Sequence, residues 1–326
     1  MELRCGLIGC GGIGELRARA IAQLPSYRLV AVSDSIESRA VAMAATHRCQ
    51  VEADWHALVH RKDVDVVIVS TPPSLHAEMS INALDNGKHV LCEKPIAITA
   101  KEAAQLRKVP KSRLVAEAFM VRHALQWLDA RKRVQKGEIG EVRAIQVMFS
   151  YFNVDPKNVR NMAGIGGGGL LDIGCYPITV SRYIFGSDPL RAAATIDRDP
   201  KFKTDRLAGG ILEFSKGRHL TFTVSTQLAP YQRVQIMGTK GRIEVEIPFN
   251  APPDVPNRIF VQGMKMNEGK WISFPVSDQY QLQAEAFGRA VRKEEKLGWG
   301  IEDAITSMRI IDALFKSGKS GKFEKV

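Results

Sequence analysis

Apolar positions follow two different patterns along this chain of 326 residues. In the first third they gather in continuous runs, which are separated by segments whose apolar residues recur every three or four positions. Continuous runs are typical of parallel strands buried on both faces, and the recurrence is typical of helices. The pattern predicts repeated βα units in a doubly wound parallel sheet, with ligands at the carboxyl ends of strands at 3–8, 27–33, 65–70, 88–92 and 114–120.

From about residue 140 the apolar positions alternate by two, as in Leu220, Phe222 and Val224. This period predicts a mainly antiparallel sheet with one face left exposed or covered by something else. Helices are expected at about 169–185 and 301–315. We therefore predict an α/β dinucleotide-binding (Rossmann) domain at 1–122 and an α+β substrate-binding domain at 123–326, whose last helix is able to pack back on the first domain.

Composition excludes several classes of protein. Apolar residues make up 45% and charged residues 25%, as in globular proteins, and no apolar run approaches the ~20 residues of a membrane helix. The first strand begins almost at once, so we expect no signal peptide, and five scattered cysteines fit a reducing cytoplasm. The net charge of +11 is spread along the chain. We expect it to attract an anionic cofactor or substrate, and neither nucleic acid nor a membrane.

A glycine-rich turn joins the first predicted strand to the first predicted helix. Gly9, Gly11 and Gly14 have the G-x-G-x-x-G spacing of turns that bind dinucleotides. Gly9 permits the tight turn, Gly11 lets a pyrophosphate approach the backbone, and Gly14 lets helix and strand pack closely. The helix N-terminus would face the phosphates. A turn without any ligand is the alternative interpretation.

The second predicted strand ends at Asp34, which lies 20 residues beyond Gly14. An acid at this distance accepts hydrogen bonds from ribose hydroxyls and repels a 2′-phosphate, which favours NAD. Ser35 follows it, and Arg39 lies one helical turn further on, within reach of a phosphate. We therefore predict NAD as the cofactor, with NADP as the alternative.

Two further segments carry polar residues where chemistry is expected. Glu93-Lys94-Pro95 ends a predicted parallel strand, and GGGLLDIGCYP at 167–177 opens the helix of the second domain. With the glycine turn and Thr71-Pro72-Pro73-x-x-His76, they resemble the glucose-fructose oxidoreductase, inositol dehydrogenase and MocA (Gfo/Idh/MocA) family over essentially the whole chain. The resemblance implies a dehydrogenase or reductase that uses a nicotinamide cofactor on sugars, cyclitols or related diols. It also implies that the second sheet has an open face, which often forms the subunit interface in this family.

The resemblance implies three catalytic residues. Lys94 matches the family's active-site lysine, and its charge would lower the cost of a developing alkoxide. Tyr176 stands where many members have histidine, so the chain resembles the tyrosine-containing branch; a nearby ammonium would ease proton exchange by this phenol. Asp172 would bind a substrate hydroxyl or orient Tyr176, although Pro177 predicts a kink nearby. A solvated lysine, a helix-start aspartate and a core tyrosine are the structural alternatives.

Other residues are expected around the cofactor. His76 would lie near its phosphate or nicotinamide, with a purely structural role equally open, and Arg122 at the domain junction would contact the cofactor or an anionic substrate group. No histidine or cysteine spacing indicates a metal site. The predicted cofactor residues are Gly9, Gly11, Gly12, Ile13, Asp34, Ser35, Thr71, Pro72, His76, Glu93, Lys94 and Arg122.

These residues favour an oxidoreductase over a catalytically silent dinucleotide-binding sensor or scaffold, which has no physical need for Lys94, Asp172 and Tyr176 together. One face of the second sheet must meet the helices, so the other is left for a partner. We expect a homodimer through this face, with a homotetramer as the second possibility. The substrate would be a small polyhydroxy compound that the sequence does not identify.

Overall fold

The structure is a computed structural model that describes residues 1–326, and it divides into two compact units. Unit 1 comprises Met1–Met120 together with Tyr280–Met308. Unit 2 comprises Val121–Gln279 together with Arg309–Val326. The long helix α9 (Ile301–Ser320) therefore supplies residues to both units.

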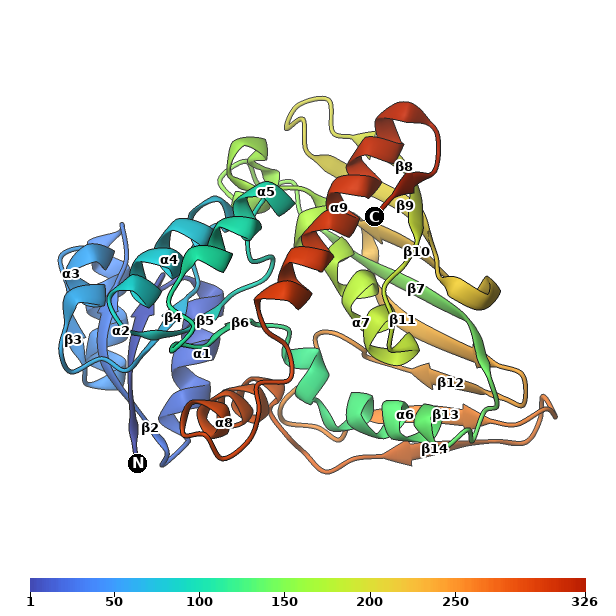
Figure 1. The fold of residues 1–326 in the computed structure, drawn as a ribbon, viewed down its shortest axis with the longest axis horizontal. Coiled ribbons are helices and arrows are strands. Elements are labelled where there is room, and N and C mark those ends of the chain that lie inside the picture. The colour runs from blue at the N-terminus through green and yellow to red at the C-terminus, as the bar shows by residue number, and fades with distance from the viewer. The chain divides into compact units, whose positions relative to one another are not determined.

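Unit 1 contains a six-stranded, wholly parallel sheet in the order β3-β2-β1-β4-β5-β6 (Figure 1). The direction of the strand order reverses at β1 and β4, and in such sheets the ligand crevice lies at the carboxyl ends of the strands beside this reversal. The predicted doubly wound sheet is confirmed. Its strands are β1 (Leu3–Ile8), β2 (Tyr27–Ser33), β3 (Gln50–Val51), β4 (Val66–Val69), β5 (His89–Cys92) and β6 (Val115–Glu117).

Helices complete unit 1 and bury its apolar strands. All four residues of β4 are buried, as expected of a central parallel strand. Helix α8 (Gln279–Val291) places Ala284 and Phe287 in the same core cluster as Leu3 and Tyr27, and the Tyr27 hydroxyl donates to the Ala284 carbonyl at 2.6 Å. The other helices are α1 (Gly12–Ala22), α2 (Glu37–His47), α3 (Trp55–His60), α4 (His76–Asp85) and α5 (Ala100–Ala103).

Unit 2 contains a nine-stranded sheet in the order β14-β13-β12-β11-β7-β10-β9-β8-β15. The pair β7 and β10 is parallel and every other pair is antiparallel, so the predicted mainly antiparallel sheet is confirmed. Its strands are β7 (Val142–Phe152), β8 (Arg191–Arg198), β9 (Asp205–Glu213), β10 (His219–Ser225), β11 (Gln227–Gly238), β12 (Arg242–Val245), β13 (Arg258–Gln262), β14 (Gly269–Ser273) and β15 (Glu324–Lys325).

The two faces of this sheet differ in what covers them. Helix α6 (Leu125–Gln135) packs on β12 and β13, and α7 (Cys175–Phe185) packs on β7 and β10 (Figure 1). Leu220, Phe222 and Val224 are buried, whereas Thr221 and Thr223 are only half-buried. The two threonines help to line a shallow hollow of about 350 Å³ on β7, β10 and β11, so the alternation by two separates a helix-covered face from an open one.

Candidate functional site

The glycine turn of unit 1 has the shape that a dinucleotide requires. Gly9 has a φ of +96°, and a Cβ there would lie 2.6 Å from the Ser70 carbonyl oxygen. A Cβ on Gly14 would lie 2.0 Å from the Gly9 carbonyl oxygen. At Gly11 and Gly12 a Cβ would meet nothing within 4 Å. The chain itself therefore needs two of these glycines, and the other two leave open space at a helix N-terminus that no side chain caps, as phosphates require.

Asp34 connects the glycine turn to the end of β2. Its Oδ2 accepts the Cys10 N–H at 2.6 Å, and its Oδ1 accepts the Ile36 N–H at 2.8 Å. Each carboxylate oxygen has a second lone-pair site, so the side chain is oriented by the backbone and can still accept ribose hydroxyls. Ser35 and Arg39 beside it are exposed.

His76 connects two loops that follow parallel strands. Its Nδ1 lies 2.7 Å from the Pro95 carbonyl oxygen and its Nε2 lies 2.7 Å from the Thr71 carbonyl oxygen. The ring is 1% exposed, and burial lowers the pKa of His76 although the two carbonyls oppose that shift. A neutral imidazole has one N–H, so His76 donates to one of these carbonyls at a time while its buried ring lies between the loops after β4 and β5.

The loop after β5 is held on both sides of Lys94. The Lys94 N–H donates to Glu93 Oε2 at 3.3 Å, and the Ile96 N–H donates to Glu117 Oε1 at 2.8 Å. The Lys94–Pro95 peptide bond is cis. Both carboxylates are buried, whereas Lys94 is half-buried. The backbone beside this half-buried lysine is therefore fixed by two buried carboxylates.

In unit 2, Asp172 lies at the centre of a polar cluster. Its Oδ2 accepts the Tyr151 hydroxyl at 2.6 Å and the Arg160 Nε–H at 2.9 Å. The negative charge of Asp172 is the largest cause that raises the pKa of Arg160, and Tyr151 and Tyr176 act in the same direction. Four polar side chains from β7, the loop after it and the following helix are therefore within electrostatic reach of one another.

Tyr176 is buried at the start of α7. It is 4% exposed, and its ring centroid lies 5.7 Å from that of Phe149 and 5.0 Å from that of Phe249. The turn before it, Leu170–Gly174, is π-helical. Pro177 has no N–H to donate to the carbonyl of Ile173, so the regular i→i−4 ladder is interrupted here, where the sequence predicts a kink.

Asp205 supports the glycine run that precedes Asp172. It is 1% exposed, and its Oδ2 accepts the Leu170 N–H at 2.6 Å. A Cβ on Gly168, whose φ is +119°, would lie 2.0 Å from Asp205 Oδ1. Burial raises the pKa of Asp205 to about 6. Glycine is thus required at 168 because this carboxylate lies directly against the backbone.

The structure therefore divides the predicted site residues between the units. Arg122 is buried in unit 2, where its carbonyl oxygen accepts the Tyr183 hydroxyl at 3.4 Å. Asp172 and Tyr176 are in the same unit, and the other predicted residues are in unit 1. Sequence reasoning missed Tyr151, Arg160 and Asp205 because strand and loop residues gave no periodic or motif signal. It also missed Arg17, a charged residue among the buried positions of α1.

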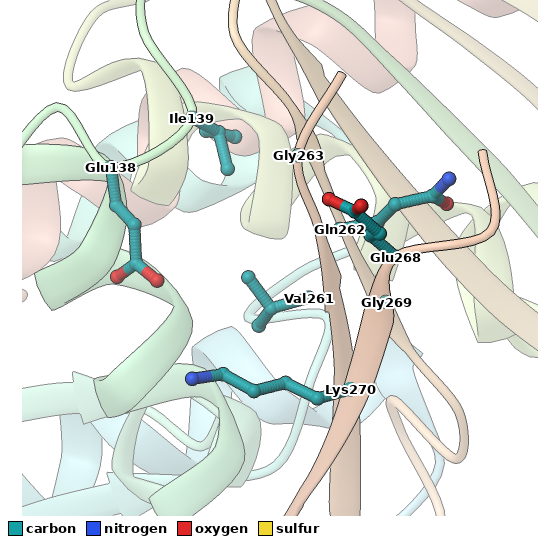
Figure 2. Close-up of a pocket in the computed structure, with 8 residues that line it drawn as sticks. All are labelled: Glu138, Ile139, Val261, Gln262, Gly263, Glu268, Gly269 and Lys270. Carbon is teal, nitrogen blue, oxygen red and sulfur yellow. The ribbon is translucent and has the colours of Figure 1, made fainter. Parts of the chain in front are cut away.

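No group of three or more His, Cys, Asp or Glu side chains is arranged to hold a metal ion, and none of the helices is both long and apolar enough for a membrane span. A separate hollow of about 400 Å³ lies between the turn after α6 and the β13–β14 hairpin (Figure 2). Figure 2 shows Ile139 and Val261 in it beside charged side chains. None of the predicted site residues lines this hollow.

Comparison with known proteins gives matches over the whole chain. Residues 3–122 match an oxidoreductase family with an NAD-binding Rossmann fold (GFO_IDH_MocA), and residues 127–244 match the GFO/IDH/MocA C-terminal domain. An uncharacterized oxidoreductase of Rhizobium meliloti is 37% identical over 99% of both chains. A dTDP-3,4-didehydro-2,6-dideoxy-alpha-D-glucose 3-reductase of Saccharopolyspora spinosa is 30% identical over 92% of this chain and 90% of its own. The crystal structure of a 3-ketoreductase from Actinomadura kijaniata with NADP and TDP-benzene has a TM-score of 0.91 at 27% identity, covering 97% of this chain and 98% of that one.

Proposed function

The chain belongs to the GFO/IDH/MocA oxidoreductase family, and we propose that it transfers a hydride between a nicotinamide cofactor and a CH–OH group of a sugar, cyclitol or related diol. The observation that carries this proposal is the loop after β5. It holds a half-buried lysine on a backbone fixed by Glu93 and Glu117. This loop lies at the carboxyl ends of the parallel strands, as does the open glycine turn after β1. A lysine fixed at the carboxyl ends of the strands is suited to stabilising charge that develops on a substrate oxygen.

Tyr176 and Lys94 are the proposed proton-transfer pair. A tyrosine in water has a pKa near 10 and is a poor base at neutral pH. An ammonium group close to the phenol would favour its ionised form and ease removal of the proton from a substrate hydroxyl. The bound nicotinamide would supply the hydride acceptor or donor. The chain is accordingly proposed to belong to the tyrosine-containing branch of the family.

Asp172 is proposed to accept a hydrogen bond from a hydroxyl of the substrate. Its Oδ2 already accepts Tyr151 and Arg160, so this carboxylate is ordered before a substrate arrives. A carboxylate is an acceptor of hydrogen bonds only, so it matches the hydroxyl donors of a polyhydroxy substrate. The neighbouring loop, 153–166, would then influence which polyhydroxy compound fits.

NAD is the proposed cofactor, with NADP as the alternative. Asp34 disfavours a 2′-phosphate by charge repulsion, whereas the exposed Arg39 offers a partner for one. The 3-ketoreductase of Actinomadura kijaniata was crystallised with NADP, which keeps the alternative open. We also propose a homodimer or homotetramer through the open sheet face, and a cytoplasmic location, which the five free cysteines support.

A substrate panel tests the proposed function. Purified full-length protein is incubated with sugars, inositols and trans-diols together with NAD or NADP, and reduced nicotinamide is followed by absorbance. Turnover of at least one polyhydroxy compound is expected. A catalytically silent sensor or scaffold would bind the dinucleotide without turning over any compound of the panel or its oxidised counterpart, and failure to bind either dinucleotide would contradict both functions.

A further inference from the structure

Arg17 is a buried charged residue that the proposed mechanism does not use. It lies on α1, three residues after Gly14, and is 1% exposed. A guanidinium removed from water is costly unless its N–H groups find partners. The groups that surround Arg17 therefore indicate its role.

The partners of Arg17 come from three other parts of unit 1. Both Nε and Nη2 lie against Glu93 Oε1, at 2.7 and 2.6 Å. Nη1 donates to Gln283 Oε1 at 2.6 Å, and Nη2 also donates to the Ala118 carbonyl at 3.4 Å. The guanidinium carbon lies 4.8 Å from the centre of the Tyr280 ring. One planar group thus joins the helix after the glycine turn to the ends of β5 and β6 and to α8.

Glu93 is the connection between this arginine and the proposed chemistry. Its Oε1 accepts Arg17, and its Oε2 accepts the backbone N–H of Lys94. Without the guanidinium, Glu93 would be a buried carboxylate next to an ammonium-bearing residue. It would then take up a proton or draw the Lys94 ammonium toward itself. Either response moves the lysine or changes its electrostatic surroundings.

We propose that Arg17 is a positioning residue for Lys94, acting through Glu93, and that α8 takes part through Gln283 and Tyr280. This inference rests on the proposed function, in which Lys94 stabilises charge on the substrate. Arginine is required because a lysine at 17 could not present a planar fork to a carboxylate, an amide and a carbonyl at once. Arg17 itself contacts neither substrate nor cofactor in this scheme.

The test uses the full-length protein and the substrate found with the panel. Arg17→Met is expected to lower kcat about 30- to 100-fold, because displacement of a reacting group by about 1 Å costs about 100-fold. The Kd for the dinucleotide, measured by nicotinamide fluorescence, should stay within about threefold, since the glycine turn is unchanged. Arg17→Lys should lower kcat at least about tenfold, as it keeps the charge and loses the fork.

A matched control separates positioning from stability. Arg292 follows α8 in unit 1, and its side chain is 10% exposed and paired with Glu294 at 2.7 Å and Glu285 at 3.5 Å. Arg292→Met is expected to lower Tm by an amount similar to Arg17→Met and to keep kcat within twofold. If Arg17→Met lowers Tm to the same extent but keeps kcat within threefold, Arg17 is only structural and the inference is wrong.

Lys94→Ala distinguishes this inference from the function on which it rests. Adding Arg17→Met to Lys94→Ala should lower kcat by less than threefold, because residues that act as a unit are non-additive. Normal turnover by Lys94→Ala would contradict the proposed function of the lysine. Lost turnover by Lys94→Ala with normal turnover by Arg17→Met would contradict the positioning role alone. If Arg17→Met does not fold, Arg17→Lys decides, and kcat within threefold of the wild type overturns the inference.

Discussion

The hydroxyl of Tyr151 donates a hydrogen bond of 2.6 Å to Oδ2 of Asp172, the same oxygen that Arg160 approaches at 2.9 Å. Tyr151 is the last residue but one of β7, and Asp172 belongs to the π-helical turn before α7. This hydrogen bond fixes the orientation of the carboxylate that we propose to accept a hydrogen bond from a substrate hydroxyl.

Removal of this bond should weaken substrate recognition. Tyr151→Phe is expected to lower kcat/KM about 10- to 100-fold, because a hydrogen bond to a charged group contributes about 1.5–3 kcal/mol. Steady-state kinetics on the panel substrate check this. Thr46→Val, which removes the hydroxyl of an exposed residue of α2 in unit 1, is the control and should change little. Equal kcat/KM in the two variants would exclude a role for the Tyr151 hydroxyl.

Tyr176 should matter for the chemical step itself. General acid–base catalysis contributes about 10²–10⁴-fold, so Tyr176→Phe should lower kcat within that range while the Kd for the dinucleotide stays nearly unchanged. Tyr183→Phe offers a control within the same helix, since that buried hydroxyl donates to the Arg122 carbonyl at 3.4 Å and its ring packs against Arg131. Near-normal turnover by Tyr176→Phe would assign proton transfer to another group or to water.

The preference for NAD or NADP should depend on Asp34 and Ser35, the two residues that follow β2. Asp34→Asn with Ser35→Arg is expected to shift the ratio of the Kd values for NADH and NADPH toward NADPH by at least about tenfold, because a repulsive charge is removed and a partner for the 2′-phosphate is added. Asparagine keeps an oxygen for the Cys10 or Ile36 N–H. Fluorescence titration measures both Kd values, with Ser35→Arg alone as the control. An unchanged ratio would place the 2′-phosphate site elsewhere.

Asp205 should make stability depend on pH in a defined direction. Its pKa is raised to about 6 in the folded protein, above the ordinary value near 4, so the folded state keeps a proton that the unfolded chain releases between about pH 4 and 6. The contribution of this group to the free energy of unfolding therefore falls as pH rises through that range, by about 3 kcal/mol in total.

Asp205→Asn lacks this titration. The free energy of unfolding of the variant minus that of the wild type should rise by about 2–3 kcal/mol between pH 4 and 7, as measured by urea denaturation at several pH values. A difference that stays flat over this pH range would mean that the Asp205 carboxylate titrates normally in the fold.

The open face of the second sheet should carry the subunit contact. Sedimentation velocity at micromolar concentration is expected to find a dimer, or a tetramer as the second possibility. Thr221→Arg with Thr223→Arg should give monomers, because the added charges would be buried against those of a symmetric partner. Thr46→Arg, at an exposed position of α2 in unit 1, should leave the assembly intact. A monomeric wild-type protein would contradict the proposal.

Several features of this protein could be predicted from its sequence because they depend on local order along the chain. The spacing of Gly9, Gly11 and Gly14 after an apolar strand predicted the turn, and continuous apolar runs predicted the parallel sheet. The alternation through Leu220, Phe222 and Val224 predicted that the second sheet has one face covered by helices and one that they leave open. Each is a periodic or short-range pattern, and such patterns reflect the geometry of a single strand, turn or helix.

Only the tertiary structure decided which polar side chains meet. Tyr151 lies 21 residues from Asp172, Asp205 lies 35 residues from Leu170, and Arg17 lies 266 residues from Gln283, yet each pair shares a hydrogen bond. No periodic signal marks these residues, because a buried polar group is stabilised by one partner in space and not by its neighbours in sequence. The sequence could therefore name Lys94 and Asp172 as candidates, while the packing of strands and helices determined which residues hold them in place.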